Sequence, residues 1–266
     1  MKIINREKQL RQGRWLAGAA LVMLTSQAPL AGETAIITGF DYSSGNYGET
    51  ERTDMLYLPL TIKYRSFPWT AKVTLPYISI TGPASVTAGG NGVLVDNSNG
   101  TARQTDSGLG DVTASLGFAL DSLWEASGNT FVDITTRVKL PTADADARLG
   151  TGETDYQLQL DVAQAIGNST PFVALGYRWI GDTDVTDYND VLYSSLGIDQ
   201  KLTDTMGVGF SYDFMQATRD DADDRQELMG YVHWKVNQKI SLNLYGVAGF
   251  TDASPDQAVG VQFIVK

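Results

Sequence analysis

Apolar residues return at every second position through most of this chain, in segments of about a dozen residues from Gly108 onward. The segment 129–141 places Val132, Ile134, Thr136, Val138 and Leu140 on one face, and Phe131, Asp133, Thr135, Arg137 and Lys139 on the other. A period of two indicates a strand, because successive side chains on a pleated backbone point to opposite sides. The charges occupy the face that a soluble sandwich would bury. This pattern favours the wall of a transmembrane β-barrel, whose polar face lines the lumen.

The first 31 residues are predicted to be a secretory signal peptide. Its basic residues are Lys2, Arg6, Lys8, Arg11 and Arg14; a short apolar run, 16–24, comes next, and small residues follow at Ala28 and Ala31. The apolar run is far shorter than the ~20 residues that a spanning helix needs. A leader cleaved near Ala31 is therefore favoured over a membrane anchor, and the folded part is expected to be 32–266.

Charge and cysteine content exclude several classes of protein. Five of the 20 basic residues and one of the 31 acidic residues lie in the leader, which leaves a net charge of −15 for 32–266. Such acidity is unfavourable for binding nucleic acid. The chain contains no Cys, so a lipoprotein anchor and a disulfide framework are excluded. No later segment approaches the ~18 consecutive apolar residues of a transmembrane helix.

The alternation predicts twelve strands whose connections alternate in length. The strands are expected at 34–42, 54–65, 68–80, 108–120, 129–141, 154–166, 169–181, 190–201, 204–216, 226–237, 238–250 and 256–265. Short connections fall at 66–67, 167–168, 202–203 and 237–238, with a medium one at 121–128, and long connections fall at 43–53, 81–107, 142–153, 182–189, 217–225 and 251–255. Bacterial barrels combine an even strand number with tight periplasmic turns and longer outer loops. A soluble sandwich has no reason to alternate in this way, so an all-β, antiparallel up-and-down transmembrane barrel is predicted.

Ten residues are candidates for a lumenal constriction: Asp133, Arg137, Lys139, Asp155, Asp161, Arg178, Asp213, Glu227, His233 and Lys235. In one interpretation they form an ion-pair lattice that braces the wall, since buried charges are normally paired. In the other, the basic side chains of Arg137, Arg178 and Lys139 oppose the carboxylates of Asp133, Asp155 and Asp161, and the transverse field orients polar solutes. Both can hold at once, because strand register decides which side chains meet.

The only histidine, His233, bears on whether the barrel is a lipid-active enzyme. It shares its face with Glu227 and Lys235, while Leu228 and Trp234 fall on the opposite, lipid-facing side. A base acting on lipid would have to face the lipid, and no nucleophile stands at a defined spacing from this one. The sequence therefore predicts no catalytic residue.

Two outer loops invite separate hypotheses. Asp182, Asp184 and Asp187 are weak calcium candidates, because alternating carboxylates can gather oxygens around Ca²⁺. The spacing is not that of an EF-hand, and clustered acids are usually solvated; lipopolysaccharide with its own divalent cations could bridge to them. The loop 81–107 is rich in Gly and Asn and carries an apolar patch at 93–95. It either folds into the barrel mouth as a plug or is mobile.

Three short motifs carry a resemblance to a known family. Gly-Leu-Gly-Asp at 108–111 precedes Lys-Leu-Pro-Thr at 139–142, and Leu-Gly-Thr-Gly at 149–152 is followed by Asp155. In these elements, within about 108–160, the chain resembles the outer-membrane family named for a "meta-pathway of phenol degradation", also called outer-membrane transporter-like proteins. The resemblance implies a passive channel for small, often hydrophobic or aromatic, compounds. The chain ends on Lys266 and not on the aromatic residue that the barrel-assembly machinery usually reads, so Phe263 is the candidate for that role.

The sequence thus predicts a channel in the bacterial outer membrane for passive diffusion of small solutes, with no cofactor. The alternative is a closed structural barrel whose outer loops bind a partner or a surface polymer. The expected partners are outer-membrane lipid and lipopolysaccharide, the barrel-assembly machinery and a small-molecule solute. A homotrimer stays open, because lipid-facing and subunit-facing surfaces have similar compositions.

Overall fold

The computed structural model describes residues 32–90, 92–96, 102–123 and 129–266, so the predicted leader at 1–31 lies outside the described residues. The strands are β1 (Glu33–Gly45), β2 (Thr53–Ser66), β3 (Trp69–Gly82), β4 (Val86–Ala88), β5 (Val93–Val95), β6 (Gln104–Leu109), β7 (Val112–Ala119), β8 (Thr130–Leu140), β9 (Asp155–Gln164), β10 (Ser169–Trp179), β11 (Val191–Lys201), β12 (Met206–Met215), β13 (Arg225–Lys235), β14 (Ile240–Gly249) and β15 (Gln257–Val265). A short 3₁₀ helix, η1 (Leu120–Leu123), follows β7. Within the described ranges, no helix is long and apolar enough to cross a membrane.

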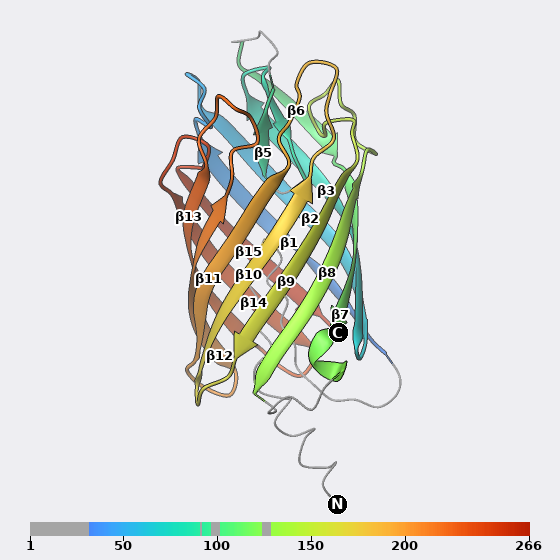
Figure 1. The fold of residues 1–266 in the computed structure, drawn as a ribbon, viewed down its shortest axis with the longest axis vertical. Coiled ribbons are helices and arrows are strands. Elements are labelled where there is room, and N and C mark those ends of the chain that lie inside the picture. Colours follow the sequence, from blue (N-terminus) through green and yellow to red (C-terminus); the bar gives the residue numbers. More distant parts are fainter. Residues whose placement is uncertain (1–31, 91, 97–101, 124–128) are drawn as a thin grey trace, which may run out of the picture.

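The long strands form one closed antiparallel barrel (Figure 1). Each strand pairs with its neighbour in the chain, and β1 pairs with β15 in a register that sets Thr38 opposite Phe263. With β6 and β7 counted as one wall strand, the described residues supply twelve strands, so the predicted up-and-down barrel is confirmed. The longer loops gather at one end and the tight turns at the other, as the alternating connections predicted (Figure 1).

The fourth wall strand differs from its prediction in both start and continuity. It begins at Gln104 as β6, which pairs with residues 77–82 of β3, and resumes as β7, which pairs with residues 69–74 of β3. The interruption falls at Gly110, whose amide donates to the carbonyl of Pro76 at 2.9 Å. A β-carbon on Gly110 would lie 2.3 Å from Cδ1 of Ile78, so a larger residue here would force the buried side chain of Ile78 to move. The break frees Asp111 to point into the barrel.

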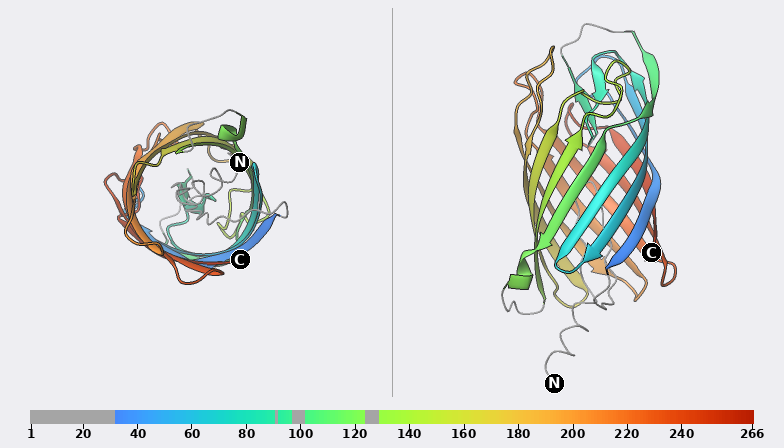
Figure 2. Two further views of the ribbon diagram at one scale, coloured as in Figure 1. Left: turned by 90° about the horizontal axis from the view of Figure 1, so that it is seen from below. Right: turned by 90° about the vertical axis from the view of Figure 1, so that its right-hand side faces the viewer.

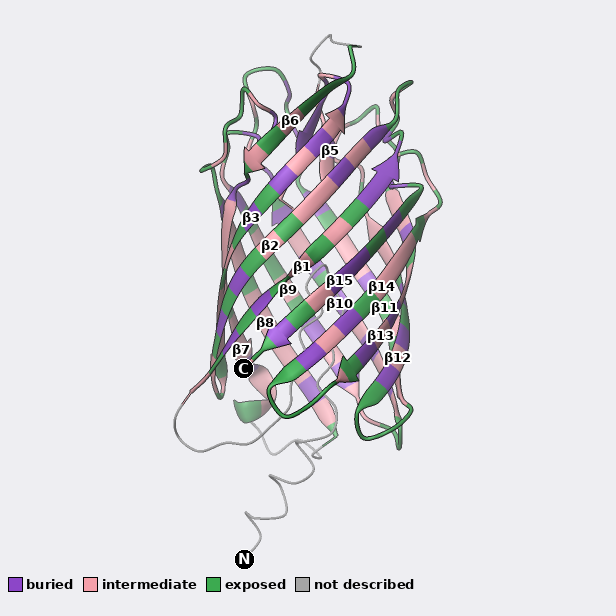
Figure 3. Cartoon of the chain, turned by 180° about the vertical axis from the view of Figure 1, so that it is seen from behind, coloured by how far each residue is buried: buried purple, intermediate pink, exposed green. Residues whose placement is uncertain are grey.

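Exposed and more buried residues alternate along the strands (Figure 3); the exposed outward residues include many large apolar ones, and many of the buried residues are polar or charged, as the alternation predicted. Exposed outward residues include Ile62, Leu196, Phe210 and Trp69, each at least 49% accessible in the isolated chain. Aromatic rings cluster near the strand ends, where Tyr177 and Trp179 meet edge to face at a centroid distance of 4.8 Å. Apolar side chains bordered by aromatic residues match the lipid-facing band of a membrane barrel.

The long connection between β3 and β6 folds back into the barrel, which confirms the plug alternative for its described part. Its β4–β5 hairpin lies inside the ring of strands at the end that carries the long loops (Figure 2). Val86 and Ala88 are buried against Ile78, Ile80 and Leu149. On the other side, Leu94 packs with Ile180, Tyr188 and Val191. The apolar patch seen in the sequence therefore forms a small core within the barrel mouth.

Candidate lumenal site

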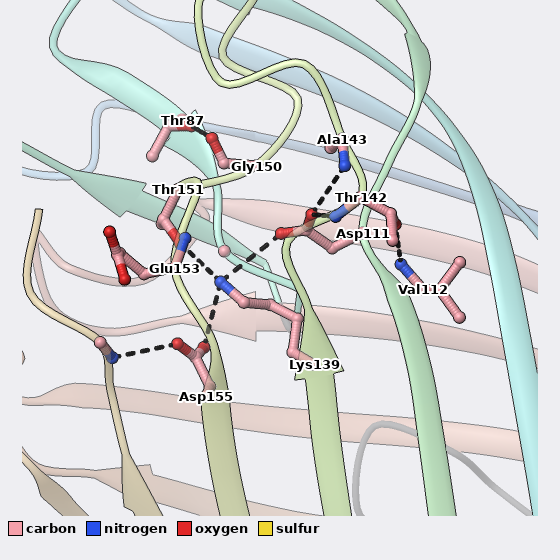
Figure 4. Close-up of polar contacts among 12 residues, drawn as sticks. Thr87, Asp111, Val112, Lys139, Thr142, Ala143, Gly150, Thr151, Glu153 and Asp155 are labelled. Atoms are coloured by element: carbon pink, nitrogen blue, oxygen red, sulfur yellow. Dashed lines mark hydrogen bonds and ion pairs between the residues drawn. The ribbon is translucent and has the colours of Figure 1, made fainter.

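A buried ion cluster lies between the wall strands β8, β9 and β10 and the plug hairpin (Figure 4). Nζ of Lys139 lies 3.5 Å from Oδ2 of Asp111 and 3.4 Å from Oδ2 of Asp155, and donates to Oγ1 of Thr151 at 2.6 Å. Nη2 of Arg178 lies 2.6 Å from the same oxygen of Asp155. Two cations and two carboxylates thus compensate one another where water is excluded, which is the condition for keeping buried charges ionised.

Asp111 holds this cluster against the loop that follows β8. Its Oδ1 accepts from the amides of Thr142 and Ala143, both at 3.0 Å, while Oγ1 of Thr142 accepts from the amide of Val112 at 2.8 Å. Gly150 passes so close that a β-carbon there would lie 2.5 Å from Oδ2 of Asp111. The three motifs that carried the family resemblance therefore meet at one place in space.

Two arginines hold the plug in place: Arg178 on β10, and Arg148 in the loop between β8 and β9. Nη2 of Arg178 donates to the carbonyl of Gly89 at 2.6 Å. Arg148, in a left-handed conformation at φ 57°, donates to the carboxylate of Asp106 at 2.8 Å and to the carbonyl of Pro83 at 2.5 Å. The same guanidinium also reaches the carbonyls of Gly82, Val86 and Gln104 at 3.2–3.3 Å. A fork of five donors suits such a group of converging acceptors.

Beneath the plug the lumen contains a cavity of about 330 Å³. Its charged lining residues are Asp41, Lys72, Arg137, Arg178, Asp213, Arg225 and Glu227. The cations of Lys72, Arg137 and Arg178 come from one arc of the wall, formed by β3 to β10. The carboxylates come from the other arc, formed by β12, β13 and β1, where Arg225 is paired with Glu227. The cavity thus has a basic side and an acidic side.

This arrangement corrects the predicted constriction. The carboxylates of Asp133, Asp155 and Asp161 lie on β8 and β9, next to the cations that they were expected to face across the lumen. Asp133 and Asp161 are direct register partners, and Oδ1 of Asp161 accepts from Gln159 at 2.5 Å. The acids that do face the basic arc are Asp213, Glu227 and a residue absent from the predicted set, Asp41. The prediction was wrong because the alternation shows on which face of the sheet a side chain lies, whereas the strand register decides which side chains it lies beside.

The remaining candidates lie on β13. His233 faces inward, as predicted; its Nε2 lies 3.1 Å from Oδ2 of Asp199 on β11, and both side chains are buried. The ring covers Gly207, where a β-carbon would lie 2.1 Å from Nε2. Lys235 shares the inward face of His233 and lies at the end of β13 that leads into a short turn. His233 is therefore placed as a buried wall residue on the inner face of the barrel.

Two aspartates of the loop between β10 and β11, Asp182 and Asp190, accept hydrogen bonds from backbone amides near them in the chain. Oδ1 of Asp182 accepts from the amide of Tyr188 at 2.8 Å, and Oδ1 of Asp190 accepts from the amide of Ile180 at 3.1 Å. Among the residues that the structure describes, no group of three or more His, Cys, Asp or Glu side chains could hold a metal ion. The calcium hypothesis for Asp182, Asp184 and Asp187 therefore gains no support.

Sequence reasoning missed Arg148, Thr151, Asp41 and Arg225. Asp41 and Arg225 continue the inward series of their strands, so the alternation of those strands contains the signal that places them in the lumen. Arg148 and Thr151 lie in an irregular loop, where no period exists to assign them a direction.

These features define a class of protein: a twelve-stranded outer-membrane β-barrel with a polar lumen and a plugged mouth. The chain belongs to the family described as "Putative MetA-pathway of phenol degradation", which matches residues 36–266. No curated protein matches the sequence significantly.

Solved structures confirm the fold. The COG4313 outer membrane channel from Pseudomonas putida F1 superimposes with a TM-score of 0.63 at 13% identity, over 90% of this chain and 96% of that one. The NanC porin gives a TM-score of 0.54 at 10% identity, over 88% and 100% of the two chains. The β domain of the Bordetella autotransporter BrkA gives 0.53 at 11% identity, over 88% and 99%. At these identities the likeness concerns the fold alone.

Proposed function

We propose that this chain is an outer-membrane channel for passive diffusion of small solutes that carry polar or charged groups. The observation that carries the proposal is the cavity of about 330 Å³ inside a closed wall, lined by charged side chains from both arcs. Charged lining side chains keep water in a pore and provide weak sites from which a solute can leave again. The cavity is of a size to hold one small molecule at a time.

Aromatic solutes fit the same proposal. Tyr57, Tyr193 and Tyr245 contribute rings to the cavity lining. A tyrosine ring gives apolar contact to a flat solute while its hydroxyl stays hydrated or hydrogen-bonded. The description of the family refers to phenol degradation, which accords with an aromatic solute.

Solute flux into liposomes tests the proposal. Purified protein reconstituted into liposomes should admit arabinose and small amino acids and exclude a trisaccharide such as raffinose, because the β4–β5 hairpin narrows the mouth. Empty liposomes and Asp204→Asn, a change in an exposed turn, are the controls. Protein that is folded, as judged by heat-modifiable gel migration, and yet admits none of these solutes would sink the channel proposal.

The second candidate is a closed barrel whose outer loops bind a partner. The observation in its favour is the hairpin held in the mouth by Arg148 and Arg178. Absence of flux for every solute, combined with binding of the folded protein to lipopolysaccharide or to a surface polymer, would support this candidate. Flux of small solutes would favour the channel.

We also infer that 1–31 is a leader removed on export, and that the barrel-assembly machinery inserts the chain with Phe263 near its end as the signal. The short apolar run and the exposed, outward Phe263 support these inferences. N-terminal sequencing of protein purified from outer membranes should begin close to residue 32. A chain that still begins at Met1 there would contradict the leader.

A further inference from the structure

The two charged sides of the cavity face each other across the barrel. Around the ring of wall strands, β3 and β12 are separated by five strands in either direction, and so are β10 and β1. Lys72 therefore projects from a strand, β3, that lies opposite the strand of Asp213, β12, and Arg178 on β10 projects from a strand opposite that of Asp41, β1. All four side chains line the same cavity. Opposition on two diameters defines a direction of charge separation, from the acidic side to the basic side.

The strand register aligns the cations of the basic side in one row. Lys72 pairs with Ser115, Ser115 with Arg137, Arg137 with Gln157 and Gln157 with Arg178, so three cations alternate with two neutral hydrogen-bonding residues along one row across five strands. On the other side, Asp213 and Glu227 are register partners. Asp41 accepts a hydrogen bond from the hydroxyl of Tyr245 at 2.7 Å, which fixes that carboxylate at the cavity wall.

We propose that the cavity is a binding site for a small zwitterion with an aromatic or other apolar body, in which the carboxylate faces the row of Lys72, Arg137 and Arg178 and the ammonium faces Asp41 and Asp213. This inference rests on the proposed channel function and names its solute class. A carboxylate fits guanidinium donors because their geometry matches two oxygens, and an ammonium needs acceptors, which the acidic side supplies. The tyrosine rings of the lining contact the body of the solute.

A solute with only one charged group is attracted by one side of the cavity and repelled by the other. A monoanion is attracted by the basic row and repelled by Asp41 and Asp213, and a monocation is attracted by the two carboxylates and repelled by the basic row. A zwitterion of the right length is attracted at both ends, because its dipole then lies along the charge separation of the cavity. The arrangement therefore selects for the pair of charges together, beyond either charge alone.

Three solutes with the same aromatic body test the proposal in liposome-swelling flux: phenylalanine, 3-phenylpropanoate and 2-phenylethylamine. We expect wild-type protein to admit phenylalanine about three- to five-fold faster than either relative at low concentration, as partly solvated ion pairs allow. Lys72→Gln with Arg137→Gln should remove the advantage over 2-phenylethylamine and keep the advantage over 3-phenylpropanoate. Asp41→Asn with Asp213→Asn should do the reverse.

The controls separate this inference from the channel proposal. Lys239→Gln and Asp204→Asn change the net charge in exposed turns and should keep the wild-type ratios. Every variant is first shown to be folded by heat-modifiable migration. Equal flux of all three solutes through wild-type protein would overturn the zwitterion site while arabinose flux still upholds the channel. Absence of arabinose flux as well would overturn the channel itself.

Discussion

The guanidinium of Arg178 lies 2.6 Å from a carboxylate oxygen of Asp155 and, with the same nitrogen, 2.6 Å from the carbonyl oxygen of Gly89. The first contact belongs to the buried ion cluster in the wall, and the second holds the tip of the plug. The same side chain also lines the cavity below. The cluster, the plug and the candidate solute site are therefore mechanically connected, and changes in one should be measurable in the others.

Lys139→Met should destabilise the barrel strongly, because it leaves Asp111 and Asp155 short of a buried counter-charge. Removal of one partner from a buried pair costs about 3–5 kcal/mol. Lys201→Met removes the same kind of side chain from an exposed pair with Asp204 and should cost at most ~1 kcal/mol. Urea unfolding of the two variants in detergent micelles measures the difference, and equal midpoints would contradict a role for the ion cluster.

Arg148→Gln should loosen the plug. The substitution removes most of the donors that hold the carbonyls of Pro83, Val86 and Gln104, and each hydrogen bond to a charged group is worth about 1.5–3 kcal/mol. Trypsin cleavage after Arg103 should then become about tenfold faster or more, as for local opening that precedes cleavage. Arg148→Lys should behave like the glutamine variant, because an ammonium cannot reproduce the planar fork.

Arg52→Gln is the matched control for that experiment. The side chain of Arg52 pairs with Asp256 on an exposed loop at the same end of the barrel. Arg103 donates to the backbone carbonyl of Arg52, which the substitution keeps, so cleavage after Arg103 should stay close to the wild-type rate. If Arg148→Gln were cleaved no faster than Arg52→Gln, the plug would be held by its apolar contacts alone.

Gly150→Ala should be costly although alanine is small. Its β-carbon would lie 2.5 Å from Oδ2 of Asp111. The Asp111 carboxylate cannot move away without losing its hydrogen bonds from the amides of Thr142 and Ala143. Overpacking of this kind costs about 1–3 kcal/mol. Gly246→Ala, where the nearest atom is 3.8 Å away, should be close to neutral. Thermal unfolding of the two variants compares them, and a stable Gly150→Ala barrel would show that the loop can shift.

The wall was predictable because its signal is local. A period of two identified the wall strands and placed Arg137, Asp213 and His233 on the inward face. The alternating loop lengths predicted which end of the barrel carries the long loops. The side chains that face each other across the lumen could not be predicted, because this depends on the strand register and on where each strand lies around the closed barrel. Asp155 was expected across the lumen from Lys139 and is its neighbour on the next strand.

The plug was harder to predict for a different reason. The patch at 93–95 is too short to show a period, and Val86 and Ala88 reveal their partners only when the barrel brings Ile80 and Leu149 beside them. Arg148 takes its role from a left-handed backbone and five acceptors supplied by distant segments. Such contacts depend on tertiary structure and leave no local pattern in the sequence.

Single-channel recording in planar bilayers tests the central claim, a solute-conducting lumen narrowed by the plug, most directly. Gly82 and Gln104 are register partners on adjacent strands, so 84–102 can be replaced by an Asn-Gly turn that closes the β3–β6 hairpin. Wild-type protein should give discrete conductance steps, and the variant without the plug should give clearly larger ones. Electrical silence of both folded proteins at either polarity would contradict the claim.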